Sequence, residues 1–167
     1  IVQCLVGSEM CIRDRSNLSP RGKFASGGSV TSAGLTAAAV KDGFSDGRFA
    51  LEAGVLPLSD RGLAAIDEFD KIGKQERSAI HPAMEQQKVR VAKGGITATL
   101  NSRCAVLAAA NPKSGRFEYR GSNASIMQSF AETDLEAPLA SRFDLIWLLS
   151  DIPDSCLLYT SDAADEP

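Results

Sequence analysis

The sequence predicts an α/β fold: a parallel sheet flanked by helices, with two β-hairpins inserted between its elements. Two apolar runs, Leu63–Ile66 and Cys104–Ala110, are typical of strands buried on both faces of a parallel sheet. A helical segment, Lys74–Gln87, lies between them, and strands that alternate with helices indicate this architecture. Two clusters of turn-forming residues, one before and one after this helix, predict the hairpins.

The amino-terminal part begins with a predicted strand at Lys23–Ala25 that enters a Gly/Ser/Thr-rich segment, residues 26–36. Two further short runs, Ala37–Lys41 and Arg48–Leu51, flank residues 42–47, which are rich in Gly and Asp. Such a cluster between two strand-like runs predicts the first β-hairpin.

The helix predicted at Lys74–Gln87 has Ile80 and Ala83 on one face. Pro82 lies inside it, and an interior proline removes one backbone hydrogen bond at a cost of about 3 kcal/mol. We therefore expect a kink near residues 78–82 or a helix that restarts at Pro82.

The second hairpin is predicted at Gln87–Arg90 and Thr97–Asn101, because Lys93-Gly94-Gly95 between them forms a turn. The buried strand Cys104–Ala110 follows. The rest predicts an exposed loop, a short helix and a last strand, at residues 113–130, Leu135–Ala140 and Phe143–Leu149.

Composition narrows the functional classes. The net charge is −3, but residues 155–167 contribute three acids and no base, and the rest of the chain is balanced. Any DNA contact must therefore come from a local basic patch.

Three of the four cysteines lie near the ends, and Cys104 in a predicted strand is interpreted as a small apolar core residue. No apolar run reaches the roughly 18 residues of a membrane span, so an intracellular protein with no membrane partner is expected.

Two adjacent carboxylates, Asp67 and Glu68, follow the apolar run Leu63–Ile66. An open α/β sheet binds its ligand at the carboxyl ends of its strands, and this pattern suits a site that holds Mg²⁺ on a nucleotide and polarises a water. Acidic residues also favour helix N-termini, so the pair could simply begin the next helix.

The wider context favours the ATPase interpretation. Five signatures occur in order, and together they closely resemble the AAA+ P-loop-type motor domain of the minichromosome maintenance (MCM) replicative helicases, archaeal members most closely, from about Arg21 to Asp154. The signatures are residues 28–36, Leu51-Glu52-Ala53-Gly54, Ile66-Asp67-Glu68-Phe69-Asp70-Lys71, Ala110-Asn111-Pro112-Lys113 and Ser141-Arg142-Phe143-Asp144-Leu145.

The resemblance implies ATP and Mg²⁺ as cofactors and gives three residues roles in hydrolysis. Asp67 would hold Mg²⁺, and Glu68 would orient and polarise the attacking water. Asn111 would be the sensor-1 residue, which contacts the γ-phosphate or that water. Asn-Pro is also a common turn signal, which is the alternative for Asn111.

The resemblance also implies that Arg142 is an arginine finger that reaches the ATP of a neighbouring subunit, so the active protein would be a hexameric ring. The alternatives are a salt bridge to Asp144 or a helix-end arginine. Lys88, Arg90 and Lys93 of the second hairpin would contact DNA phosphates, with Lys93 matching the lysine of the family's pre-sensor-1 hairpin. A solvated charged hairpin explains the same pattern.

The two ends do not resemble the family. Residues 1–15 and 155–167 are interpreted as added sequence around a partial AAA+ core at 16–154, incomplete at both ends. No Gly-x-x-x-x-Gly-Lys-Ser/Thr loop occurs in the sequence, so this chain alone is expected neither to bind ATP tightly nor to unwind DNA.

The parent protein is expected to be an ATP-dependent DNA helicase of the cytoplasm or nucleoid, or of the nucleus in a eukaryote. A chelatase-type or transcription-activator-type AAA+ ATPase and a non-catalytic MCM-like subunit are the alternatives.

Overall fold

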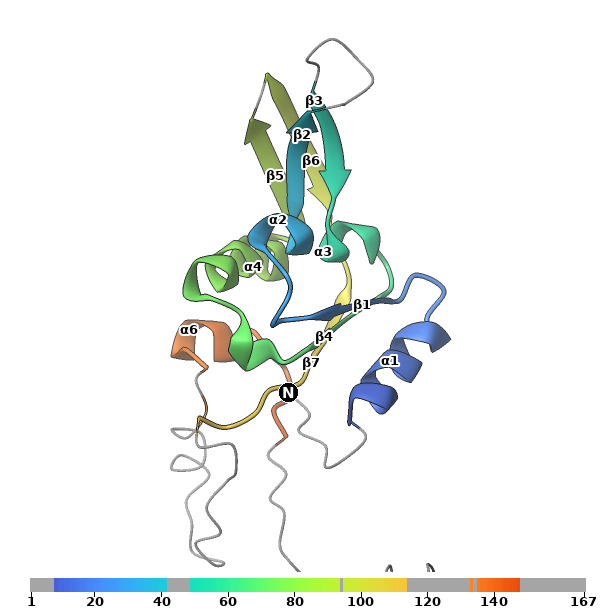
Figure 1. The fold of residues 1–167 in the computed structure, drawn as a ribbon, viewed down its shortest axis with the longest axis vertical. Helices are drawn as coiled ribbons and strands as arrows, with labels where there is room; N and C mark the ends of the chain where they lie inside the picture. The colour runs from blue at the N-terminus through green and yellow to red at the C-terminus, as the bar shows by residue number, and fades with distance from the viewer. Residues whose placement is uncertain (1–7, 42–48, 94, 114–132, 134, 148–167) are drawn as a thin grey trace, which may run out of the picture.

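The computed structural model describes residues 8–41, 49–93, 95–113, 133 and 135–147. At its centre is a three-stranded parallel sheet in the order β1-β4-β7 (Figure 1). These strands are β1 (Lys23–Ser26), β4 (Leu63–Asp67) and β7 (Ala105–Ala108). The parallel sheet is confirmed, and Ala64, Ala65 and Ile66 of the middle strand β4 are fully buried.

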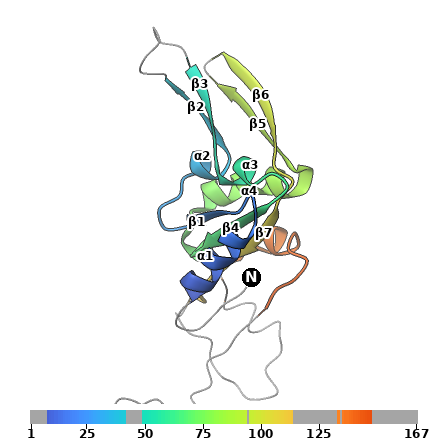
Figure 2. The same ribbon diagram turned by 90° about the vertical axis from the view of Figure 1, so that its right-hand side faces the viewer.

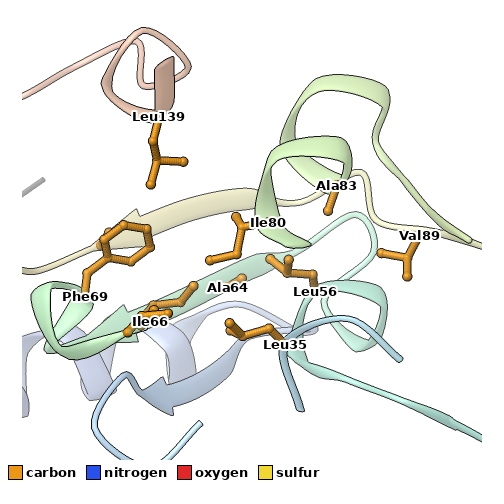
Figure 3. Packing of buried hydrophobic residues seen from close by; sticks show 11 residues of the cluster. Leu35, Leu56, Ala64, Ile66, Phe69, Ile80, Ala83, Val89 and Leu139 are labelled. Atoms are coloured by element: carbon orange, nitrogen blue, oxygen red, sulfur yellow. The ribbon is translucent and has the colours of Figure 1, made fainter. Parts of the chain in front are cut away.

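The two faces of the sheet pack against different helices. Successive side chains of a strand point to opposite faces. Ala64 and Ile66 therefore enter the larger core, while Ala65 contacts Ile12 of α1 (Ser8–Leu18) on the other face. The larger core is formed by α2 (Ser32–Leu35), α3 (Val55–Leu58), α4 (Lys74–Gln86) and α6 (Ala137–Ala140), with the side chains shown in Figure 3.

The two predicted hairpins are confirmed. The first pairs β2 (Ala37–Lys41) with β3 (Phe49–Ala53), and the second pairs β5 (Lys88–Lys93) with β6 (Ile96–Asn101). They lie side by side and project from the same side of the sheet layer (Figures 1 and 2). In the second hairpin, Gly95 has φ 78°, a left-handed conformation that glycine adopts without strain.

Helix α4 runs through Pro82 as one element. Of the two expected outcomes, the restart at Pro82 is therefore wrong, and the kink near residues 78–82 stays a prediction. The buried side chains of Ile80 and Ala83 on either side of the proline anchor both halves of the helix to the same core. Burying an aliphatic side chain contributes about 2 kcal/mol, which offsets much of the cost of the lost hydrogen bond. No helix of the described ranges is long and apolar enough to cross a membrane.

The carboxyl-terminal part differs from the prediction. Residues 143–147 form no strand; the last two residues of the predicted strand lie outside the described residues, as do residues 114–130 of the predicted loop. A strand needs a hydrogen-bonded neighbour, and a groove of about 390 Å³ separates this segment from β7. Leu145 and Trp147 are accordingly 68% and 58% exposed.

Helix α1 continues through residue 15, so the boundary of the proposed added sequence falls inside a helix whose Ile12 is buried. That both ends are added sequence stays a prediction.

Candidate active site at the end of the central strand

The two predicted carboxylates lie where β4 ends. Asp67 is only 7% exposed, and its Oδ1 accepts a hydrogen bond of 2.8 Å from the backbone N–H of Glu68. Glu68 then takes the left-handed conformation, with φ 50° and ψ 42°, and begins the short 3₁₀ helix η1 (Phe69–Lys71). This conformation costs a non-glycine residue about 1 kcal/mol, and such strain is concentrated at functional sites.

Both carboxylate oxygens of Glu68 are paired. Ser26 at the end of β1 donates its hydroxyl to Oε2 at 2.8 Å, and the ammonium of Lys71 contacts Oε1. The hydrogen bond from Lys71, and then that from Ser26, lowers the pKa of Glu68. The Lys71 side chain is 54% exposed, so solvent screens this ion pair and it separates at little cost. Glu68 is thus ionised and held toward β1.

The turn after β1 fits closely against these carboxylates. Gly27 donates its N–H to the carbonyl of Asp67 at 2.7 Å. A Cβ added to Gly27 would lie 2.3 Å from the carbonyl oxygen of Glu68, and one added to Gly28 would lie 3.0 Å from its Oε2. Glycines here allow the backbone to approach the acidic pair.

Asn111 lies beside η1, the turn that follows β4, because β7 is the neighbour of β4. Its backbone N–H donates to Oδ1 of Asp70 at 2.9 Å, and its side chain is exposed. The structure thus brings Asn111 to the same edge of the sheet as Asp67 and Glu68. The catalytic roles of all three stay predictions.

Arg142 points elsewhere. Its Nη2 donates to Oε2 of Glu85 on α4 at 2.9 Å, and its Nη1 contacts the carbonyl of Pro138. Of the two predicted alternatives, the salt bridge to Asp144 is replaced by one to Glu85, and the contact with the carbonyl of Pro138 in α6 matches a helix-end arginine. The next residue, Phe143, packs edge-to-face on Phe69 with ring centroids 6.0 Å apart, which ties this segment to η1.

The cations of the second hairpin do not share one face. Lys88 and Arg90 are exposed and alternate with buried Val89, whereas Lys93 is an odd number of residues away and belongs to the opposite face. Lys93 ends β5 and is exposed. The patch is therefore spread around the hairpin rather than gathered on one side.

Sequence reasoning missed three features: two contributors to this site and one ion pair at the opposite edge of the sheet. Ser26 carries no signal beyond its place at a strand end, and Asp70 was named only as a member of the motif Ile66–Lys71. The third is Asp60, which holds Arg103 through Oδ1 and Oδ2 at 3.0 and 2.9 Å, joining the segments that lead into β4 and β7. Hydrogen bonds from Arg103 lower the pKa of Asp60 from 3.8 to about 2.

Comparisons with known proteins extend these observations. The MCM P-loop domain matches residues 7–157. DNA replication licensing factor MCM7 of rice (Oryza sativa subsp. indica) is 45% identical over 156 residues, which cover 90% of this chain and 21% of that protein. DNA replication licensing factor mcm7-B of Xenopus laevis is 43% identical with the same coverage. DNA replication licensing factor Mcm6 of Drosophila melanogaster is 44% identical over 153 residues, 89% of this chain and 18% of that protein.

The chain thus spans about a fifth of the length of these relatives. All three come from eukaryotes, and the closer likeness to archaeal members stays a prediction.

Proposed function

The chain belongs to the MCM family, and from this premise we propose that it is part of the motor of an ATP-dependent DNA helicase that opens duplex DNA at replication. The observation that carries the proposal is the placement of Asp67 and Glu68 at the end of the central strand, with Asn111 at the end of the neighbouring strand. Ligands of open α/β sheets bind at this edge. A replicative helicase of this kind acts in the nucleoid or, in a eukaryote, in the nucleus.

The donor set fits a magnesium nucleotide. Mg²⁺ takes one or two carboxylates together with phosphate oxygens and waters. Asp67 uses Oδ1 for the amide of Glu68, and within the described part of the chain its Oδ2 accepts no hydrogen bond. Asp67 is therefore the residue that would hold the ion, which supplies neutralisation of the phosphate charge when it is bound.

Glu68 and Asn111 act on the water and the phosphate in this proposal. Glu68 is ionised and can accept a hydrogen bond from the attacking water once Lys71 releases Oε1. The exposed side chain of Asn111 can donate to the γ-phosphate or to the same water. Positioning of this kind accounts for most of the catalysis of phosphoryl transfer.

Arg142 belongs to the subunit interface in this proposal. Its guanidinium is half-buried and paired with an exposed Glu85 side chain, so it can exchange that partner for a phosphate of the adjacent subunit. The motor would then be a ring, a hexamer by likeness to the family, with each ATP hydrolysed between two protomers.

We propose that the second hairpin binds DNA. Lys88, Arg90 and Lys93 are exposed cations that suit phosphates, and none of the described residues of this hairpin is aromatic. Contact through phosphates alone carries no base information, so binding would be independent of sequence.

The alternative is an MCM-like subunit without turnover, which the pairing of Glu68 with Lys71 favours. The variant Glu68→Gln in the full-length protein distinguishes the helicase motor from the subunit without turnover. We expect hydrolysis to fall by at least about a hundredfold with ATP affinity retained, since the amide keeps the shape but loses the base. Retained hydrolysis would remove Glu68 from the mechanism, and a wild-type protein that binds ATP without turnover would establish the alternative.

A further inference from the structure

Asp70 makes a contact that links the two strands carrying the candidate site. Its Oδ1 accepts the backbone N–H of Asn111 at 2.9 Å, across 41 residues of sequence. Two backbone hydrogen bonds join the same two chain segments just before this contact. Ala109 donates to the carbonyl of Ile66 at 2.9 Å, and Phe69 donates to the carbonyl of Ala109 at 2.7 Å. The carboxylate of Asp70 therefore continues the connection between β4 and β7 beyond the point where the strands end.

Asp70 can act in this way because its own backbone is fixed. Its carbonyl accepts a hydrogen bond of 2.5 Å from Nη2 of Arg77, a residue only 3% exposed. The preceding residue, Phe69, is fully buried and packs on Phe143. Within η1, Lys71 donates its N–H to the carbonyl of Glu68 at 2.8 Å. Glu68 and Asp70 thus belong to one rigid turn.

We propose that Asp70 is a positioning residue that sets the distance between Asn111 and Glu68. This inference rests on the proposed ATPase function. Asn111 is exposed and lies where β7 has already ended, so its backbone depends on the contact with Asp70 for its place. A hydrogen bond from an amide to a carboxylate is charge-assisted and suits this task. A displacement of about 1 Å at a reacting group is enough to cost a large factor in rate.

The test uses Asp70→Ala and Asp70→Asn in the full-length protein. Alanine removes the acceptor, whereas asparagine keeps an oxygen that can accept the Asn111 amide. Glu52→Ala is the control, because Glu52 is an exposed acid on β3, away from this edge. The first readout is hydrogen–deuterium exchange of the peptide that contains Asn111, without nucleotide. We expect exchange at this amide to rise about tenfold in Asp70→Ala and to stay near the wild-type rate in the other two variants.

The second readout is the rate of ATP hydrolysis, measured at saturating ATP and at lower ATP concentrations. We expect kcat of Asp70→Ala to fall about tenfold with ATP affinity within about threefold of wild type, and Asp70→Asn to recover most of the loss. The inference would be overturned if Asp70→Ala showed the same exchange rate and the same kcat as the wild type. It would also be overturned if Asp70→Asn were as impaired as Asp70→Ala in both readouts. If the wild-type protein lacked ATPase activity, the proposed function would fail, while the exchange of Asn111 would still decide whether Asp70 holds it.

Discussion

Phe69→Ala is the substitution that most directly tests how the candidate site is anchored. Phe69 is fully buried, and its neighbours in the sequence are the two acidic residues Glu68 and Asp70. Its ring packs on that of Phe143 at an interplanar angle of 86°, with the centroids 6.0 Å apart. Replacing a buried phenylalanine by alanine costs about 3–5 kcal/mol. Roughly 1 kcal/mol of that loss belongs to the edge-to-face pair with Phe143. We expect the free energy of unfolding to fall by about 4 kcal/mol.

Urea unfolding followed by the fluorescence of Trp147, the single tryptophan of the chain, measures this change. Phe143 is only half-buried, so Phe143→Ala should cost less, about 2 kcal/mol. The double variant should then cost about 1 kcal/mol less than the sum of the two single changes. Leu58→Ala is the matched control, because Leu58 is 50% exposed and its loss should cost no more than about 0.5 kcal/mol.

The reasoning would be refuted if Phe69→Ala cost no more than Leu58→Ala, because the turn after β4 would then not depend on this packing. Strict additivity of the Phe69 and Phe143 substitutions would refute the contact between the two rings.

Two further predictions concern charges. The pKa of Asp60 is lowered to about 2 in the folded protein by Arg103, from 3.8, so its stabilising contribution is present above about pH 4 and is lost as the pH falls toward 2. Thermal unfolding between pH 5 and pH 2 should therefore show a shallower loss of stability in Asp60→Asn, and identical profiles would contradict the ion pair. Lys93→Ala in the full-length protein should weaken binding to single-stranded DNA, reduce the slope of log affinity against log salt by about 0.7, and uncouple unwinding from ATP hydrolysis. Lys74→Ala, an exposed lysine at the start of α4, should leave that slope unchanged, and an unchanged slope in Lys93→Ala would remove this residue from the DNA contact.

The hairpins and the strand Leu63–Asp67 were accessible from the sequence because their signals are local. Turn residues between two strand-like runs specify a hairpin whatever surrounds it. The predicted last strand at Phe143–Leu149 failed over its described part for the opposite reason. An apolar run becomes a strand only where a neighbouring strand supplies hydrogen bonds, and among the described residues no strand pairs with residues 143–147. The restart at Pro82 failed because core packing on both sides of the proline outweighs the local cost.

The sequence by itself determined the class of the fold, the placement of Asp67 and Glu68 at a strand end, and the likeness to the MCM family. Periodicity and turn chemistry act over a few residues, so they can be read along the chain. Only the tertiary structure decided which distant residues meet. Ser26 reaches Glu68 across 42 residues, Asp70 reaches Asn111 across 41, and Arg142 reaches Glu85 across 57. These contacts follow from the register of β1, β4 and β7 and from the packing of α6, which no local pattern specifies.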